Sequence, residues 1–172
     1  KNVPVLAFVE DVAASGGYWI AVVADEIFVD ANSIVGSIGV ISAGFGFHDL
    51  IARYGVERRV YTAGTSKSTL DPFQSENKDD VQRLKSMLED VHETFKNHVN
   101  KCRGEKLCQE EDLFNGAFWT GQKAVELGLV DQIGHLDAII KERYGDKVRI
   151  KHYGPKKSLV SRFGAKILNV AD

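Results

Sequence analysis

Apolar and polar positions fall into blocks along the chain, and the pattern within each block predicts an element. Residues 3–10, "VPVLAFVE", are apolar and rich in β-branched side chains, and they predict a buried strand. The stretch "YWIAVVAD" predicts a buried helix that starts near Gly16, and "EIFVD" at 26–30 predicts a second strand. Glycines punctuate residues 31–42, which predict a short strand between two loops.

The middle of the chain predicts two helices with a strand between them. "FHDLIARYG" at 47–55 predicts a short amphipathic helix ended by Gly55, and "VERRVYTAG" at 56–64 predicts a strand. The longest helix is expected from about Asp79 to Lys101, because apolar residues recur there at steps of three and four. These residues form one stripe: Val81, Leu84, Leu88, Val91, Phe95 and Val99.

The C-terminal part predicts further helices and one more strand. Thr120 suits the N-cap of a short helix that ends at Gly128, and "LDAIIKERYG" predicts another helix. "VRIKHYG" at 148–154 predicts the last strand, and residues 156–172 predict a basic amphipathic helix. Strands that alternate with helices indicate an α/β fold with a largely parallel sheet.

The bulk composition narrows the class of protein. With 172 residues, 44% of them hydrophobic and 27% charged, the chain suits a single globular domain spanning 1–172. A formal charge of −2 lacks the basic excess of nucleic-acid binders, so we expect no nucleic-acid partner. No apolar run reaches the ~18 residues that suggest a membrane span.

The two cysteines, Cys102 and Cys108, leave three interpretations open. Their Cys-x5-Cys spacing matches no common zinc motif, although His98 and Cys102 stand four apart on a predicted helix. A disulfide would suit an oxidising compartment, and two unrelated free thiols are the simplest alternative. We predict the free thiols, no metal and no other cofactor.

The stretch "DVAASGGYWI" at 11–20 places Ser15 where a strand turns into a helix. One interpretation is structural, since serine is a favoured N-cap and the following Gly16 and Gly17 let the chain turn. The other is catalytic, since the unsatisfied N–H groups at a helix start can stabilise an oxyanion, and small neighbours admit a carbonyl group. On its own, the local pattern favours the cap.

A serine nucleophile needs a base, and no histidine is spaced to supply one. We interpret all five histidines as surface or structural residues: His48, His92, His98, His135 and His152. A lysine whose pKa is lowered by burial is the other workable base. Lys67 in "AGTSKSTLDPF" stands among hydroxyl side chains, with no acidic residue closer than Asp71, although an exposed loop lysine would show the same pattern.

Four segments occur together in a recognisable order: "DVAASGGYWIAVVADEIFV", "GSIGVIS", "TAGTSKSTLDPF" and "TGQKAVELGLVDQIG". In them the sequence resembles the signal peptide peptidase A family of serine–lysine proteases, over about residues 5–144. The resemblance implies the fold of Clp protease and the crotonases, an α/β spiral of ββα units with a largely parallel sheet. It also implies a serine endopeptidase that cleaves signal peptides or other membrane-associated peptides through an acyl-enzyme.

The resemblance assigns roles by motif. Ser15 matches the family nucleophile, and Lys67 matches its general base. Ser37 in "VGSIGV" matches a serine that helps to hold the lysine amine, and the Gly16 N–H is expected to be an oxyanion donor. Relatives with tandem repeats take nucleophile and base from different repeats, whereas this chain has one set. By that analogy we expect a homo-oligomeric ring whose subunits share the dyad.

Two family features are not found in this sequence. Relatives carry a second oxyanion glycine in a Pro-Gly-Gly turn upstream of the nucleophile strand, and a membrane anchor before it. We therefore expect a soluble fragment with an incomplete oxyanion hole, from a protein anchored at full length on the extracytoplasmic (periplasmic) face of a membrane. Ala117 also stands where relatives usually carry arginine, which removes any salt bridge that this arginine makes.

Two other classes of protein remain open from the sequence. A crotonase-like enzyme acting on an acyl-CoA would share the fold but would use carboxylates and backbone donors in place of Ser15 and Lys67. A non-catalytic homologue would serve as a scaffold for membrane partners. Its docking site could be the basic tail, with Lys156, Lys157, Arg162 and Lys166.

Overall fold

Residues 1–136 form one unit of the chain and residues 137–172 form another, and each is described by itself. The structure is a computed structural model that describes residues 3–64 and 66–154. Helix α5 (Leu136–Tyr144) begins at the boundary and is the helix that "LDAIIKERYG" predicts. Within the described residues, no helix combines the length and the hydropathy needed to cross a lipid bilayer.

The first sheet of the larger unit is parallel throughout. Strand β1 (Leu6–Val9) pairs with β3 (Glu26–Val29), and β3 pairs with β6 (Gln132–Ile133). Three of the four β3 side chains, those after Glu26, are fully buried. A parallel strand covered on both faces shows a continuous apolar run rather than alternation, which is why "IFV" of β3 is visible as a strand in the sequence.

The second sheet contains the strands that end at the candidate site. Strand β2 (Val12–Ala14) runs parallel to β4 (Ile34–Gly36), and β5 (Phe118–Thr120) pairs with β4 antiparallel. Three of the four strand pairs formed by described residues are therefore parallel. The predicted α/β fold with a largely parallel sheet is confirmed.

Two short helices cover the strands, α1 (Gly16–Ala21) and α4 (Gly121–Glu126). Thr120 caps α4 as predicted, because its Oγ1 accepts a hydrogen bond from the N–H of Lys123 at 3.4 Å. The two sheets together with α1 and α4 are called the strand base below. Its core is packed from fully buried apolar side chains such as Ile27 and Val35.

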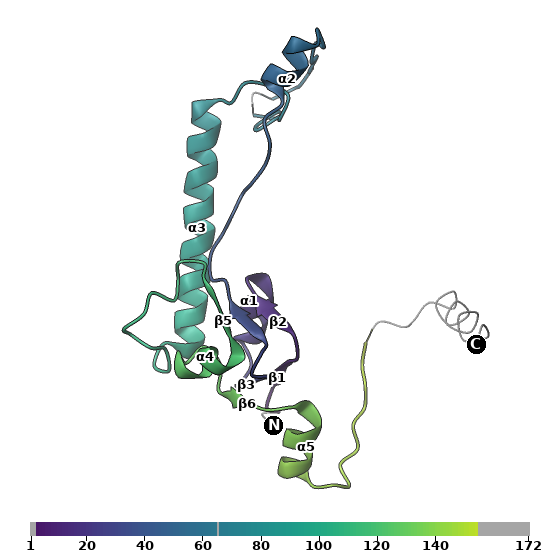
Figure 1. Cartoon of the computed structure of the whole chain (residues 1–172), viewed down its shortest axis with the longest axis vertical. Helices are drawn as coiled ribbons and strands as arrows, with labels where there is room; N and C mark the ends of the chain where they lie inside the picture. The colour runs from purple at the N-terminus through teal and green to yellow at the C-terminus, as the bar shows by residue number, and fades with distance from the viewer. Residues whose placement is uncertain (1–2, 65, 155–172) are drawn as a thin grey trace, which may run out of the picture. The chain divides into compact units, whose positions relative to one another are not determined.

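Helix α2 (His48–Arg53) follows β4, so the order strand–strand–helix occurs twice, as β1–β2–α1 and β3–β4–α2. These are the ββα units of the expected spiral. Residues 40–77, which contain α2, are called the α2 segment. Figure 1 shows this segment leaving the strand base after β4, extending alongside α3, and placing α2 near the N-terminal end of that helix.

Helix α3 (Lys78–Arg103) is the long helix that the apolar stripe predicts. Asn77 caps it by accepting hydrogen bonds from the N–H groups of its first turn. The stripe is buried only toward the C-terminal end, where Phe95 is 4% exposed and Val99 is fully buried. Farther toward the N-terminus, Val91 is 48% exposed.

Two predicted strands are wrong. Residues 56–64 and 148–154 form no strand, and most of their side chains are exposed. A strand needs a neighbour for its backbone hydrogen bonds, and local alternation does not say whether one exists. The short strands β2, β5 and β6 were not predicted, because two or three residues show too little periodicity. The helix predicted at 156–172 lies outside the described residues.

Candidate active site

Ser15 and Ser37 stand side by side because of the register between two parallel strands. Ala14 ends β2 opposite Gly36, which ends β4, and each serine is the next residue along its strand. The Ser15 N–H donates to the Gly36 carbonyl at 2.8 Å, which continues the ladder to the serines. Ligand sites in open parallel sheets form beyond the carboxyl ends of strands, and both serines occupy that position.

The backbone at both serines is in the left-handed region, where residues other than glycine are uncommon. The φ angle is 52° at Ser15 and 53° at Ser37. Such conformations store strain and persist only where the surroundings fix them, and they concentrate at functional sites. Leu70 has a φ of 59°, and these three are the described residues other than glycine that adopt such values.

The sequence left open whether Ser15 is a helix cap or a nucleophile. The structure shows whether its side chain makes a capping hydrogen bond. Ser15 occupies the N-cap position of α1, but its side chain makes no capping hydrogen bond. Its ψ of −120° turns the chain sharply from β2 into the helix. The Ser15 side chain therefore does not cap the helix, and Ser15 lines the adjoining pocket.

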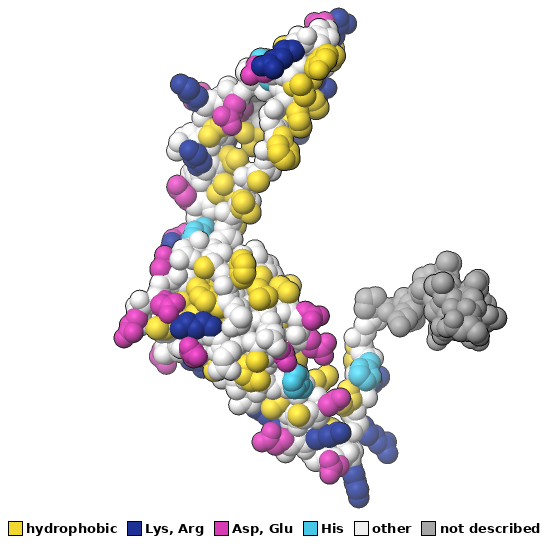
Figure 2. All heavy atoms as spheres, in the orientation of Figure 1, with side chains coloured by type: hydrophobic (Ala, Val, Ile, Leu, Met, Phe, Trp, Pro, Cys, Tyr) yellow, Lys and Arg dark blue, Asp and Glu magenta, His cyan; other side chains and the backbone are white. Residues whose placement is uncertain are grey.

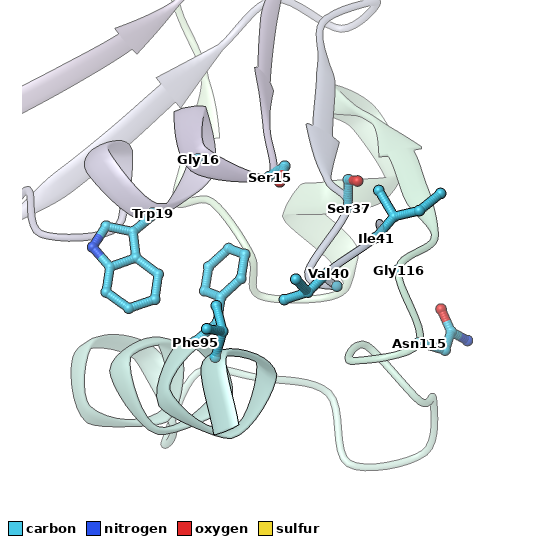
Figure 3. A pocket seen from close by; sticks show the side chains of 11 residues that line it. Ser15, Gly16, Trp19, Ser37, Val40, Ile41, Phe95, Asn115 and Gly116 are labelled. Carbon is cyan, nitrogen blue, oxygen red and sulfur yellow. The ribbon is translucent and has the colours of Figure 1, made fainter. Parts of the chain in front are cut away.

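A pocket with a volume of about 660 Å³ lies beside the two serines (Figure 3). Ser15 and Gly16 line it from the start of α1, and Ser37 lines it from the end of β4. The rest of the lining comes from α1, from the loop after β4, from α3 and from the residues before β5, and much of it is apolar. These residues are Trp19, Gly39, Val40, Ile41, Val91, Phe95, Asn115 and Gly116. None of these lining residues carries a charge.

Backbone hydrogen bonds fix the turn that carries Ser37. The Ser37 N–H donates to the Ala117 carbonyl at 2.7 Å, and the Gly39 N–H donates to the Ser37 carbonyl at 2.9 Å. Gly36, with a φ of 105°, leaves room for the Trp119 ring, which would lie 2.7 Å from an added Cβ. Ala117 acts here through its backbone, so the turn does not depend on the side chain at that position.

Lys67 lies in a different place from the two serines within one chain. It is exposed, in the turn after Gly64, and it is not among the residues that line the pocket. The preceding Ser66 accepts a hydrogen bond from Arg83 at 2.9 Å, which sets this turn beside the N-terminal half of α3. Arg83 is about 18 Å along the helix from Phe95, at 1.5 Å per residue. The structure thus brings together Ser15, Gly16 and Ser37, but not Lys67.

Buried polar contacts lie where α1 packs on the core. The Tyr18 hydroxyl donates to the Leu129 carbonyl at 2.7 Å, and burial raises the pKa of Tyr18 well above its ordinary value. Nearby, Arg103 is 3% exposed and forms an ion pair with Asp131 at 2.9 Å. The Tyr18 contact thus ties α1, which follows Ser15, to the core, and the Arg103–Asp131 pair lies beside it.

Neither a metal centre nor a disulfide is formed by the described residues. They contain no group of three histidine, cysteine or acidic side chains that could hold a metal ion. Cys102 and Cys108 are both free, with Cys102 exposed. His98 does not pair with Cys102 in a site; its Nε2 instead lies 3.2 Å from the Trp19 carbonyl.

Sequence reasoning missed the contacts of His98 and of a second histidine, His92. His92 Nε2 lies 3.1 Å from the carbonyl oxygen of Ile38, the residue after Ser37. Both histidines flank Phe95 on α3, and Phe95 lines the pocket. In the sequence, the one sign of these contacts is that His92 and His98 stand on either side of Phe95, and this spacing is a weak signal.

Known proteins resemble the chain over nearly its whole length. It is 53% identical over 158 residues to a Brucella abortus protein named Na(+)/H(+) antiporter NhaA, covering 92% of this chain and 22% of that protein. It is 36% identical over 167 residues to the Probable protease SohB of Haemophilus influenzae, covering 95% of this chain and 46% of the relative. The chain thus spans less than half the length of these relatives.

A solved structure and a family model complete the comparison. A membrane-bound stomatin-specific protease in complex with a substrate peptide matches with a TM-score of 0.40 and 13% identity, covering 98% of this chain and 71% of that one. The model of peptidase family S49 matches residues 1–148, which include both serines, Lys67 and α3. This chain therefore belongs to peptidase family S49.

Proposed function

We propose that the protein is a serine endopeptidase in which Ser15 is the nucleophile and Lys67 of a second copy is the general base. The observation that carries the proposal is the state of Ser15. Its hydroxyl caps nothing, its backbone is strained at φ 52°, and it borders an apolar pocket beside Ser37. A plain N-cap serine would need none of these features.

The chemistry follows from Ser15 and Gly16, which border the pocket, and from Lys67 of the second copy. A neutral Lys67 amine takes the proton of the Ser15 hydroxyl as the oxygen attacks a peptide carbonyl carbon. The Gly16 N–H, at the first position of α1, donates to the oxyanion that forms. The lysine ammonium then protonates the departing amine, the C–N bond breaks, and an ester remains on Ser15. The same lysine, neutral again, takes a proton from water as the water oxygen attacks the ester carbon; the bond to the Ser15 oxygen breaks, and the lysine ammonium protonates that oxygen.

The uncharged pocket suits a lysine base. An ammonium group loses its hydration when it enters apolar surroundings, which lowers the pKa of the amine and favours its neutral form. The pocket offers no carboxylate that would stabilise the charged form. Ser37, next to Ser15 across the β2–β4 pair, is the hydroxyl we assign to holding the amine.

The exposed apolar surface of the α2 segment supports a second copy as the source of Lys67. Helix α2 has no buried residue. Four large side chains of the segment are at least 79% exposed, namely Ile41, Phe45, Tyr54 and Tyr61. Figure 2 shows hydrophobic side chains gathered along one side of this region. Soluble proteins rarely leave such a surface uncovered, and covering it with another copy would carry Lys67 to that copy's pocket.

The substrates we propose are peptides with an apolar side chain near the cut, since Trp19, Val40 and Phe95 line the pocket. The family membership and the protease relatives support peptide substrates over the acyl-CoA considered from the sequence. Signal peptides and other membrane-associated peptides, met on the extracytoplasmic face, are the class that the sequence resemblance implies.

Labelling with a fluorophosphonate, which modifies activated serines, tests the nucleophile. We expect the unchanged protein to be labelled on Ser15, Ser15→Ala to be unlabelled, and Ser37→Ala to be labelled more slowly. Ser42→Ala, in the α2 segment, is the matched control and should keep the full rate. Label that persists in Ser15→Ala would refute the assignment. An unlabelled protein that assembles but cleaves no peptide would favour the non-catalytic scaffold.

A further inference from the structure

Two histidines on α3 each reach one wall of the candidate pocket. His92 Nε2 lies 3.1 Å from the Ile38 carbonyl, in the loop that follows Ser37. His98 Nε2 lies 3.2 Å from the Trp19 carbonyl, on the helix that follows Ser15. Each contact joins segments more than fifty residues apart in the chain.

The chemistry of the two contacts fixes the role of each ring. A carbonyl oxygen can only accept a hydrogen bond, so Nε2 must carry the hydrogen in both histidines. The other ring nitrogen, Nδ1, is then an acceptor in both histidines. Neither His92 nor His98 is among the residues that line the pocket, so we assign them no proton transfer with Ser15.

The groups they bind have few other ways of being held. Trp19 lies near the end of a six-residue helix, where carbonyl groups lack an intrahelical partner, and His98 supplies a donor. The His98 ring also stacks on the Trp19 indole, with centroids 4.5 Å apart and planes 21° apart. Ile38 is fully buried directly after the strained Ser37, and the contact to His92 holds its carbonyl.

We propose that His92 and His98 are positioning residues, which lock the Ser37 loop and the α1 helix to α3 and so keep both strained serines in reacting geometry. The inference rests on the proposed function, because it concerns the same serines. Strained backbone conformations persist only where neighbours over-determine them, and these two donors act at both sides of the pocket. Phe95, between the histidines, closes the pocket from the same helix.

Substitution by leucine and by glutamine separates the donor from the bulk of the side chain. Leucine fills much of the ring's volume without a donor, whereas the glutamine amide can reach a similar position and donate. We expect His92→Leu and His98→Leu each to lose about tenfold in the rate of fluorophosphonate labelling of Ser15. The glutamine variants should keep the rate within about twofold. His135→Gln, on an exposed histidine, is the matched control.

Two measurements distinguish this proposal from a general loss of structure. For hydrolysis of a fluorogenic peptide, we expect His92→Leu to lower kcat with little change in KM, since it acts at Ser37. We expect His98→Leu to raise KM as well, since Trp19 lines the pocket. Folded leucine variants with unchanged kcat, KM and labelling rate, or glutamine variants as impaired as leucine, would overturn the proposal.

A measurement that does not depend on activity tests the proposal if the protein hydrolyses no peptide or if a leucine variant does not fold. Nitrogen NMR of the unchanged protein reports which ring nitrogen carries the hydrogen. We expect both His92 and His98 as the Nε2–H form, and slow amide exchange at Gly39 that stays as slow in His92→Gln as in His135→Gln, because the glutamine amide keeps the donor. The Nδ1–H form at either histidine would refute its anchoring role, whatever the outcome for Ser15.

Discussion

The strand base and the α2 segment differ in what covers their apolar side chains. In the strand base, apolar side chains from both sheets, α1 and α4 form one core, and Ile27 and Val35 are fully buried. In the α2 segment, Tyr54 and Tyr61 are exposed and α2 buries no residue. Helix α3 belongs to both, since its stripe is buried at Phe95 and half exposed at Val91. One regular pattern thus lies in two environments, and in the proposed assembly a second copy covers the exposed one.

The largest effect should come from truncating the buried end of the α3 stripe. Phe95→Ala removes a ring that is 4% exposed, and it should lower the free energy of unfolding by about 3–5 kcal/mol. Met87→Ala, on the same helix but 57% exposed, should change it by less than about 0.5 kcal/mol. Urea unfolding of the two variants measures both. Equal losses would mean that α3 is packed alike along its length.

Breaking a buried ion pair should have a somewhat smaller effect. Arg103→Ala leaves Asp131 with Lys106 as its one charged partner among the described residues, and it removes the donor to the Gly128 carbonyl. We expect a loss of about 3 kcal/mol in the free energy of unfolding. Arg59→Ala removes the exposed pair with Glu57 in the α2 segment and should cost less than about 1 kcal/mol. A comparable cost for the two variants would contradict the contrast between the regions.

Acid should loosen the strand base through Asp131. Burial opposes the charge of this carboxylate, but hydrogen bonds from Arg103 and Lys106 outweigh it and lower its pKa from 3.8 to about 2. A pKa that is lower in the folded chain stabilises the fold above the unfolded value, so this contribution is lost as the pH falls from about 4 to about 2. Unfolding curves across that range should show it, and Asp131→Asn should flatten the dependence. A variant that keeps the full slope would assign the effect to other groups.

The smallest effect on the stability of one chain should come from the exposed tyrosines. The double variant Tyr54→Ser, Tyr61→Ser should change the free energy of unfolding by less than about 0.5 kcal/mol, since both rings lie in solvent. It should weaken self-association, which sedimentation at several concentrations measures. Lys85→Ser, on exposed α3 surface, is the control. Unaltered association in the tyrosine variant would exclude this part of the α2 segment from the interface.

The sequence predicts most of the strand base because its elements are continuous apolar runs or helices with clear caps. The elbow at Ser15 was visible for a similar reason, since small residues at Ala14, Gly16 and Gly17 mark a tight turn before an apolar helix. The strand expected at 56–64 did not form, because pairing depends on a neighbour that local alternation does not reveal.

The pocket was less predictable than the elbow. The adjacency of Ser15 and Ser37 depends on the register of β2 against β4, two three-residue strands that leave almost no periodic signal. The contacts of His92 and His98 depend on where α3 crosses the pocket, which is a tertiary property. The exposure of apolar side chains in the α2 segment is equally unpredictable, since the local sequence does not specify which residues contact a side chain.

Mixing two inactive variants tests the shared dyad most directly. Ser15→Ala and Lys67→Ala, given different tags, are co-expressed, and assemblies that carry both tags are isolated to prove mixing. In a random equal mixture, about a quarter of the sites would pair an intact Ser15 with an intact Lys67 from its neighbour. We predict that peptide hydrolysis rises from the background of either variant to about that fraction of the unchanged protein. Proven mixed assemblies with no activity above that background would contradict the account.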